Sequence, residues 1–151
     1  FFLMVMYYKS FAISGGIVLS SFISIIGVIF AHVIMDLITA DTFYLTATSL
    51  IGFIGLIGIN SRNSTLILDF SKQLVHEKNL TINEAIAKAS ATRSKPIILT
   101  VLTVVFASAL IANDAVFGGL GVALIGGTLI SYVVSMFFVP VIIKNQLKKI
   151  L

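Results

Sequence analysis

The residue whose type and position most clearly indicate chemistry is an arginine inside an apolar stretch. Arg62 stands in the polar run NSRNST at residues 60–65, within a segment otherwise apolar enough to cross a bilayer. A cation in the hydrocarbon costs at least about 2.5–3.5 kcal/mol on insertion scales, and such residues usually mark a functional path. Arg62 is therefore the leading candidate functional residue. The alternative is an arginine nearer the interface, whose side chain extends to the headgroups.

A buried cation requires a counter-ion, and this sequence offers none at the depth of Arg62. Asp69 shares the helical face of Arg62 but lies about two turns nearer the end of the segment. The other acidic residues fall in the expected connections: Asp36, Asp41, Glu77, Glu84 and Asp114. We therefore expect the counter-ions of Arg62 on a helix that this sequence does not contain.

Small and polar residues define one face of the same helix. Gly55, Gly58, Arg62, Thr65 and Asp69 follow the three- and four-residue spacing of one helical face. This pattern predicts close helix approach at the glycines and an arginine that faces the bundle interior, not lipid.

The next apolar segment carries two hydroxyl side chains on one face, Thr100 and Thr103. Their hydroxyls could join a polar network with Arg62. The alternative is a hydrogen bond to the carbonyl four residues earlier, which is common for Thr in membrane helices.

Other chemistries have little support in this sequence. There is no cysteine, which excludes disulfides and thiolate chemistry. The two histidines, His32 and His76, are far apart, so a metal site is not expected. His32 is either a proton carrier or an interfacial side chain paired with Asp36. No nucleophile–base–acid set appears, and we expect neither an enzyme nor an organic cofactor.

The composition requires lipid as solvent. Hydrophobic residues make up 58% of the 151 residues and charged residues 11%, too few to cover a soluble domain. The sequence predicts an all-α integral membrane bundle with about four spanning helices. The expected spans are residues 12–35, 43–70, 96–112 and 117–143.

Two further helical pieces are expected. Residues 1–8 are apolar but too short to span, and we interpret them as the end of an earlier helix, so that residues 1–151 form the C-terminal transmembrane part of a larger protein. Thr81 and Glu84 form a capping-box pattern that begins an amphipathic helix at about 81–91. We expect this helix along the membrane surface, with Pro96 in the first turn of the next span.

The basic residues predict the topology. With four crossings, nine of the ten Lys and Arg residues fall on one side, and Arg62 falls inside the membrane. The charged residues of the opposite connections are all acidic. By the positive-inside rule the basic side, including the C-terminus, is cytoplasmic. The net charge of +4 is thus a topology signal and not a sign of nucleic-acid binding.

The last expected span contains small residues every four positions. Such a ladder predicts tight helix packing. Its members are Gly119, Ala123, Gly127, Ser131 and Ser135.

Several motifs together resemble the resistance–nodulation–division (RND) efflux transporters. The stretch GLIGINSRNSTLILDF resembles their tenth transmembrane helix, and INEAIAKASATRSKPIILT resembles the segment that follows. GGLGVALIGGTLISYVVSMFFVPVII resembles their last helix, and YYKSF resembles the turn between their eighth and ninth helices. The resemblance covers nearly the whole sequence, in order.

The resemblance implies a proton-driven antiporter of the bacterial inner membrane, with protons as the coupling ion. Arg62 matches the basic residue that pairs with two aspartates of the family's fourth helix, and Thr100 matches a hydroxyl of the same network. Asn63, Asp69, Arg93 and Thr103 would support it. The family further implies a homotrimer with a periplasmic adaptor and an outer-membrane channel.

Two departures and two alternatives accompany this interpretation. The milder departure is Lys95, which stands where the family pattern has Arg. Many family members have Lys at the position of Arg62, and Arg can change partners but not release a proton. A related lipid exporter or protein-export auxiliary is the second hypothesis. A non-transporting membrane scaffold, in which Arg62 only orders the bundle, is the third.

Overall fold

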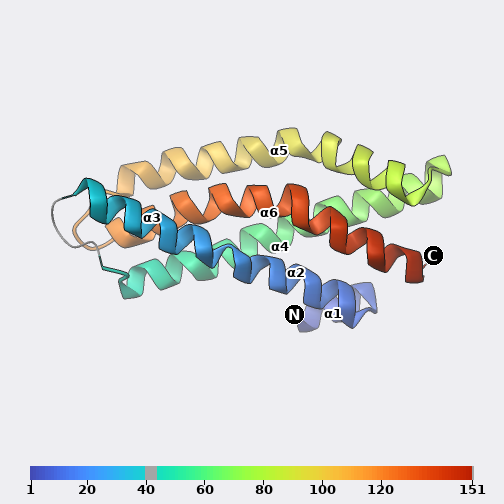
Figure 1. Cartoon of the computed structure of the whole chain (residues 1–151), viewed down its shortest axis with the longest axis horizontal. Coiled ribbons are helices and arrows are strands. Elements are labelled where there is room, and N and C mark those ends of the chain that lie inside the picture. Colours follow the sequence, from blue (N-terminus) through green and yellow to red (C-terminus); the bar gives the residue numbers. More distant parts are fainter. Residues whose placement is uncertain (40–43, 151) are drawn as a thin grey trace.

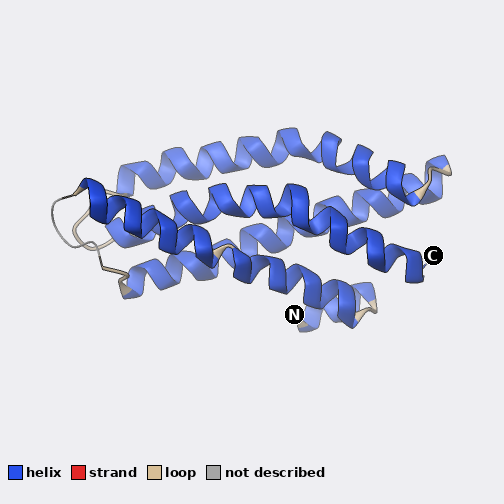
Figure 2. Cartoon of the chain, viewed as in Figure 1, coloured by secondary structure: helices blue, strands red, loops and turns tan. Residues whose placement is uncertain are grey.

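The computed structural model describes residues 1–39 and 44–150, and the side chains of residues 1–39 and 44–145. Every regular element in these ranges is a helix (Figures 1 and 2). Asp41 of the predicted acidic connection lies outside the described residues. The helices are α1 (Phe2–Tyr8), α2 (Phe11–Ile23), α3 (Ile25–Ile38), α4 (Ala47–Lys78), α5 (Ile82–Ile111) and α6 (Gly118–Ile150).

The structure confirms the predicted all-α membrane bundle. Four stretches are long and apolar enough to cross a membrane: Phe11–Ile38, Ala47–Lys78, Ile82–Ile111 and Gly118–Asn145. The first comprises α2 and α3, which meet at Ser24 and continue in nearly the same direction (Figure 1). The predicted stub at residues 1–8 is the short helix α1.

One predicted element is wrong in its boundaries. The expected surface helix at 81–91 and the expected span at 96–112 form one continuous helix, α5, with Pro96 in its interior. The capping box does begin a helix: the Thr81 hydroxyl accepts from the Glu84 N–H, and the Glu84 carboxylate accepts from the Thr81 N–H at 3.2 Å. Proline is tolerated inside membrane helices because neighbouring groups satisfy the freed backbone. α4 likewise extends past residue 70 to Lys78.

Helix α6 lies at the centre of the bundle and packs against α2, α3, α4 and α5 (Figure 1). The small-residue ladder of α6 lies against α4. Gly119 faces Ser49, Ala123 faces Gly52, and Gly127 faces Leu56. The two helices therefore run parallel, with each step of four residues on α6 matched by about one turn of α4.

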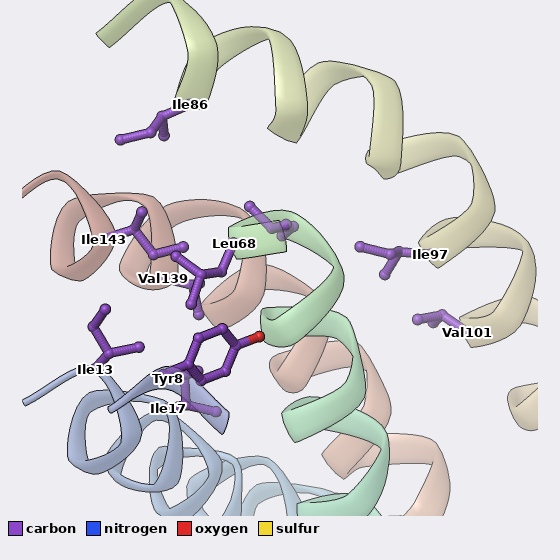
Figure 3. Packing of buried hydrophobic residues seen from close by; sticks show 10 residues of the cluster. Tyr8, Ile13, Ile17, Leu68, Ile86, Ile97, Val101, Val139 and Ile143 are labelled. Atoms are coloured by element: carbon purple, nitrogen blue, oxygen red, sulfur yellow. The ribbon is translucent and has the colours of Figure 1, made fainter. Parts of the chain in front are cut away.

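The largest apolar cluster fills the end of the bundle that holds the chain's N-terminus and most of its basic residues. Its side chains come from α1, α2, α4, α5 and α6. Figure 3 shows the hydroxyl oxygen of Tyr8 directed toward α4. Ile13, Ile17, Leu68 and Val139 are among its buried members. This cluster fixes α1 against α2 and α4, which positions the groups described next.

Candidate functional site

Helix α4 has one buried face and one face that the rest of the described chain leaves uncovered. The buried face consists of Ser49, Gly52, Leu56, Asn60, Asn63, Ser64, Ile67, Leu68, Ser71 and Leu74. Gly55, Gly58 and Arg62 on the other side are exposed, and Thr65 and Asp69 are half-buried. These five residues are called the open face of α4 below.

Arg62 lies at the midpoint of α4. It is 15 residues from Ala47 and 16 from Lys78, or about 23 Å from either end at 1.5 Å per residue. Its side chain is exposed, and within residues 1–39 and 44–145 no hydrogen bond or ion pair joins it to another side chain. The described helices thus do not surround Arg62, so the interior that the sequence predicted for it is not formed by the described part of the chain.

The glycines of the open face also lack a neighbour. A Cβ added at Gly58 would have nothing within 4 Å, and one at Gly55 would meet only Leu124 at 4.0 Å. Close helix approach at Gly55 and Gly58 therefore does not occur within the described chain. It stays a prediction about a helix that the chain does not contain.

Asp69 closes the open face at the basic end of α4. Its carboxylate accepts a hydrogen bond of 3.0 Å from the hydroxyl of Tyr8. The Lys72 amine lies 4.8 Å from the centre of the Tyr8 ring, within the range of a cation–π interaction. A hollow lined by Leu3, Tyr8, Thr65 and Asp69 opens beside this group. Asp69 is thus engaged with α1 and not with Arg62.

The two threonines of α5 bond to their own helix. The Thr100 hydroxyl donates to the carbonyl of Pro96 at 3.1 Å, and the Thr103 hydroxyl donates to that of Leu99. These are the i−4 hydrogen bonds that the sequence left open as an alternative. No hydrogen bond in the described part of the chain joins Thr100 or Thr103 to Arg62.

Arg93 and Asn63 lie between helices. The Arg93 guanidinium lies over the Phe70 ring, 4.7 Å from its centre, and so bridges α5 and α4. Its Nε atom is buried without a hydrogen-bond partner, as is the Nδ2 atom of Asn63. Neither side chain is bonded to Arg62.

A buried hydrogen-bond cluster around Asn60 was not predicted. The Asn60 amide nitrogen donates to the hydroxyl oxygens of Ser20 and Ser21, each at 3.1 Å, and its carbonyl oxygen accepts from the Ser135 hydroxyl at 2.8 Å. We call these four residues the Asn60 node. Ser135 had appeared in the small-residue ladder and Asn60 in the polar run at residues 60–65, but neither pattern predicted that the two side chains would meet.

His32 is buried and bonded on both ring nitrogens. Nδ1 lies 2.8 Å from the Val28 carbonyl oxygen and Nε2 lies 2.8 Å from the Ser49 hydroxyl. A carbonyl only accepts, so Nδ1 carries the hydrogen of its contact with Val28. The bond to Ser49 joins α3 to α4 near the start of α4, where Ser49 also faces Gly119, the first residue of the small-residue ladder.

Asp114 orders the turn before α6, at the end of the bundle opposite the basic residues. Its carboxylate accepts from the backbone N–H groups of Val116 at 2.8 Å and Phe117 at 2.9 Å. These two donors, Phe117 first, lower the pKa of the Asp114 carboxyl below its ordinary value. The ionised side chain therefore fixes the turn between α5 and α6.

Comparison with known proteins places the chain in a family. Residues 1–144 match the AcrB/AcrD/AcrF family. The chain is 33% identical over 99 residues to the multidrug resistance protein MdtC of Erwinia tasmaniensis and 32% identical over the same length to MdtC of Yersinia pseudotuberculosis. Each alignment covers 62% of this chain and 10% of the relative, so the chain spans about a tenth of these proteins. The chain belongs to the AcrB/AcrD/AcrF family of RND transporters.

Proposed function

We propose that this chain forms part of a proton-driven antiporter that exports drugs across the bacterial inner membrane. The observation that carries the proposal is the open face of α4. It presents a guanidinium at mid-helix, beside two glycines, with no described helix covering it. A cation left in lipid at this depth is costly, so the face requires a partner that carries negative charge.

The partner that fits is a helix with carboxylates at the depth of Arg62. The glycines would allow that helix to approach closely, and its ionised carboxylates would pair with the guanidinium. The family resemblance supplies such groups in the two aspartates of the fourth helix. Thr100 would join this network by exchanging its hydrogen bond to the Pro96 carbonyl for one to a network member.

Arg62 would act by changing partners. Proton binding to the aspartates removes their charge and weakens their hold on the guanidinium. Because Arg remains protonated, it does not release a proton itself but moves or reorients. The equilibrium between two helix arrangements then depends on the protonation state of the aspartates, which is the requirement for coupling proton entry to drug export.

Two alternatives fit less well. A non-transporting scaffold of these four spans would leave Arg62 against lipid. A lipid exporter would share the bundle, but the relatives named above are multidrug resistance proteins, which favours drugs as the substrate class. By the same resemblance we propose a homotrimer that works with a periplasmic adaptor and an outer-membrane channel, with the basic end of the bundle in the cytoplasm.

The test uses the full-length transporter in everted membrane vesicles. Drug transport and proton flux are measured for wild type, Arg62→Ala and Lys78→Ala, with abundance in the membrane matched. Lys78 is the control because it is a cation at the end of the same helix. We expect Arg62→Ala to abolish both activities and Lys78→Ala to preserve them. Normal drug-driven proton flux in Arg62→Ala would refute the proposal.

A further inference from the structure

We infer that Asn60 is a positioning residue whose buried amide sets the rotation of α4 about its axis. It thereby keeps the open face, with Arg62, directed away from the other described helices. The inference rests on the proposed function, in which the open face meets carboxylates of another helix. It concerns a residue whose side chain touches neither that face nor the expected partner.

The orientation of the Asn60 amide follows from its partners. The hydroxyls of Ser20 and Ser21 donate their hydrogens to the Ile17 carbonyl, at 2.6 and 3.1 Å, so their oxygens are left as acceptors. The amide nitrogen of Asn60 must therefore face α2, and the amide oxygen accepts from Ser135 on α6. Both N–H groups of the amide and one lone pair are satisfied in a site with no solvent exposure.

The node differs from the other buried polar contacts of α4. The Ser71 hydroxyl donates to the Ile67 carbonyl of its own helix, and Ser49 bonds to α3 through His32 alone. Within the described side chains, Asn60 is the residue of α4 that bonds to two other helices at once. Apolar helix contacts in lipid are weakly directional, so hydrogen bonds and small-residue contacts decide how a helix is rotated.

The node and the open face lie on opposite sides of α4. Asn60 and Arg62 are two residues apart, which is about 200° around the helix axis. A rotation of α4 that turned the open face toward the other described helices would also pull Asn60 out of the node. The rotation of α4 that satisfies the hydrogen bonds of the Asn60 amide is thus the one that places the Arg62 guanidinium on the uncovered side of the helix.

No titratable group belongs to the node itself, since its members are Asn60, Ser20, Ser21 and Ser135. The titratable groups near Arg62 on the open face are Asp69 and, packed against it from α1, Tyr8, with Lys72 beside them. Loss of the node should therefore change proton coupling only by changing the direction in which the Arg62 side chain points.

The first part of the test is a double-mutant cycle on the thermal stability of the full-length transporter. The variants are Asn60→Leu, Ser135→Ala and the pair, with Ser71→Ala as the control that removes a buried hydroxyl bonded only within α4. We expect the fall in Tm of the pair to be smaller than the sum of the two single falls, and Ser71→Ala to have little effect. Additive shifts would show that the node does not exist as described.

The second part is the pH profile of drug efflux, which a merely structural role would not move. A nearby cation lowers the pKa of a carboxyl, so a misplaced Arg62 raises the apparent pKa of the coupling step. We expect Asn60→Leu to raise it, with efflux falling about tenfold at matched abundance, whereas Arg62→Ala, which abolishes efflux, gives no profile to compare. Ser135→Ala, a milder change, should shift it in the same direction if Asn60→Leu does not fold.

The outcomes separate the two claims. If Arg62→Ala abolishes efflux while Asn60→Leu and Ser135→Ala keep the wild-type profile, the positioning role is overturned and the proposed function stands. If Arg62→Ala leaves efflux and its profile unchanged, the proposed function fails, and the positioning role fails with it. Loss of efflux in Arg62→Ala together with a shifted profile in Asn60→Leu and Ser135→Ala, and none in Ser71→Ala, supports both.

Discussion

Tyr8 of α1 and Asp69 of α4 are joined by a 3.0 Å hydrogen bond, although 61 residues separate them in the sequence. The Tyr8 side chain is 6% exposed, and its ring belongs to the main apolar cluster (Figure 3). This contact places α1 at one end of the open face of α4. It leaves the region around Arg62 as the part of that face where another helix has room to lie.

We predict that Tyr8→Phe lowers stability without creating a cavity. The change removes one donor and leaves the Asp69 carboxylate without the hydroxyl, so the expected loss is about 1–2 kcal/mol. The measurement is the Tm of the purified transporter. Tyr7→Phe is the matched control, because Tyr7 is 69% exposed. Equal Tm values for the two variants would show that the Tyr8–Asp69 bond contributes nothing.

The α4–α6 contact predicts a strong penalty at Gly127. A Cβ there would overlap the side chain of Leu56, which is fully buried. We expect Gly127→Ala to cost about 1–3 kcal/mol as overpacking. The same substitution at Gly15, where a Cβ would have nothing within 4 Å, should change stability little. A Gly127→Ala protein as stable as Gly15→Ala would argue against this packing.

The open face predicts a second steric effect, which appears only if another helix covers it. Gly58→Leu in the full-length transporter should reduce efflux strongly, since the added side chain would occupy the place of that helix. Gly15→Leu, on α2 and away from the open face, is the control. Transport rates measured in vesicles at matched abundance decide the point, and full activity of Gly58→Leu would mean that the face is covered by lipid.

The hydrogen bonds of Asp114 predict that the stability of the turn between α5 and α6 depends on pH. Its pKa is lowered in the folded state by the N–H groups of Phe117 and Val116. The resulting stabilisation is present above the unfolded pKa of about 3.8 and is lost as the pH falls through the lower folded value. Asp114→Ala should therefore reduce Tm at pH 7 and lose this part of the acid sensitivity. A Tm difference from wild type that stays constant down to pH 3 would contradict the assignment.

The sequence predicted the features that depend on local pattern. Uninterrupted apolar length predicted the spans, and four-residue spacing predicted the Gly119–Gly127 ladder that lies against α4. The spacing of Gly55, Arg62 and Asp69 correctly grouped them on one face. What it could not tell was whether that face points toward the other helices of the chain, since helical periodicity defines a face but not its neighbour.

The features that the sequence missed depend on contacts between distant segments. Asn60 looked like one more member of a polar run, because its partners Ser20 and Ser135 are 40 and 75 residues away. Pro96 was expected to begin a helix, since proline lacks the N–H that an interior position uses. In the structure α5 runs through it, so local propensity gave way to the continuous packing of α5 on α4 and α6.

The central claim is that Arg62 pairs with carboxylates that this chain does not supply. A structure of the full-length transporter in a lipid nanodisc tests it most directly, by the distance from the Arg62 guanidinium to the nearest carboxylate oxygen. The account predicts a charge-assisted hydrogen bond of about 2.7–2.9 Å to an aspartate or glutamate of another transmembrane helix packed on Gly55 and Gly58. A guanidinium that extends to the headgroups, or that is bonded only to residues of this chain, would contradict it.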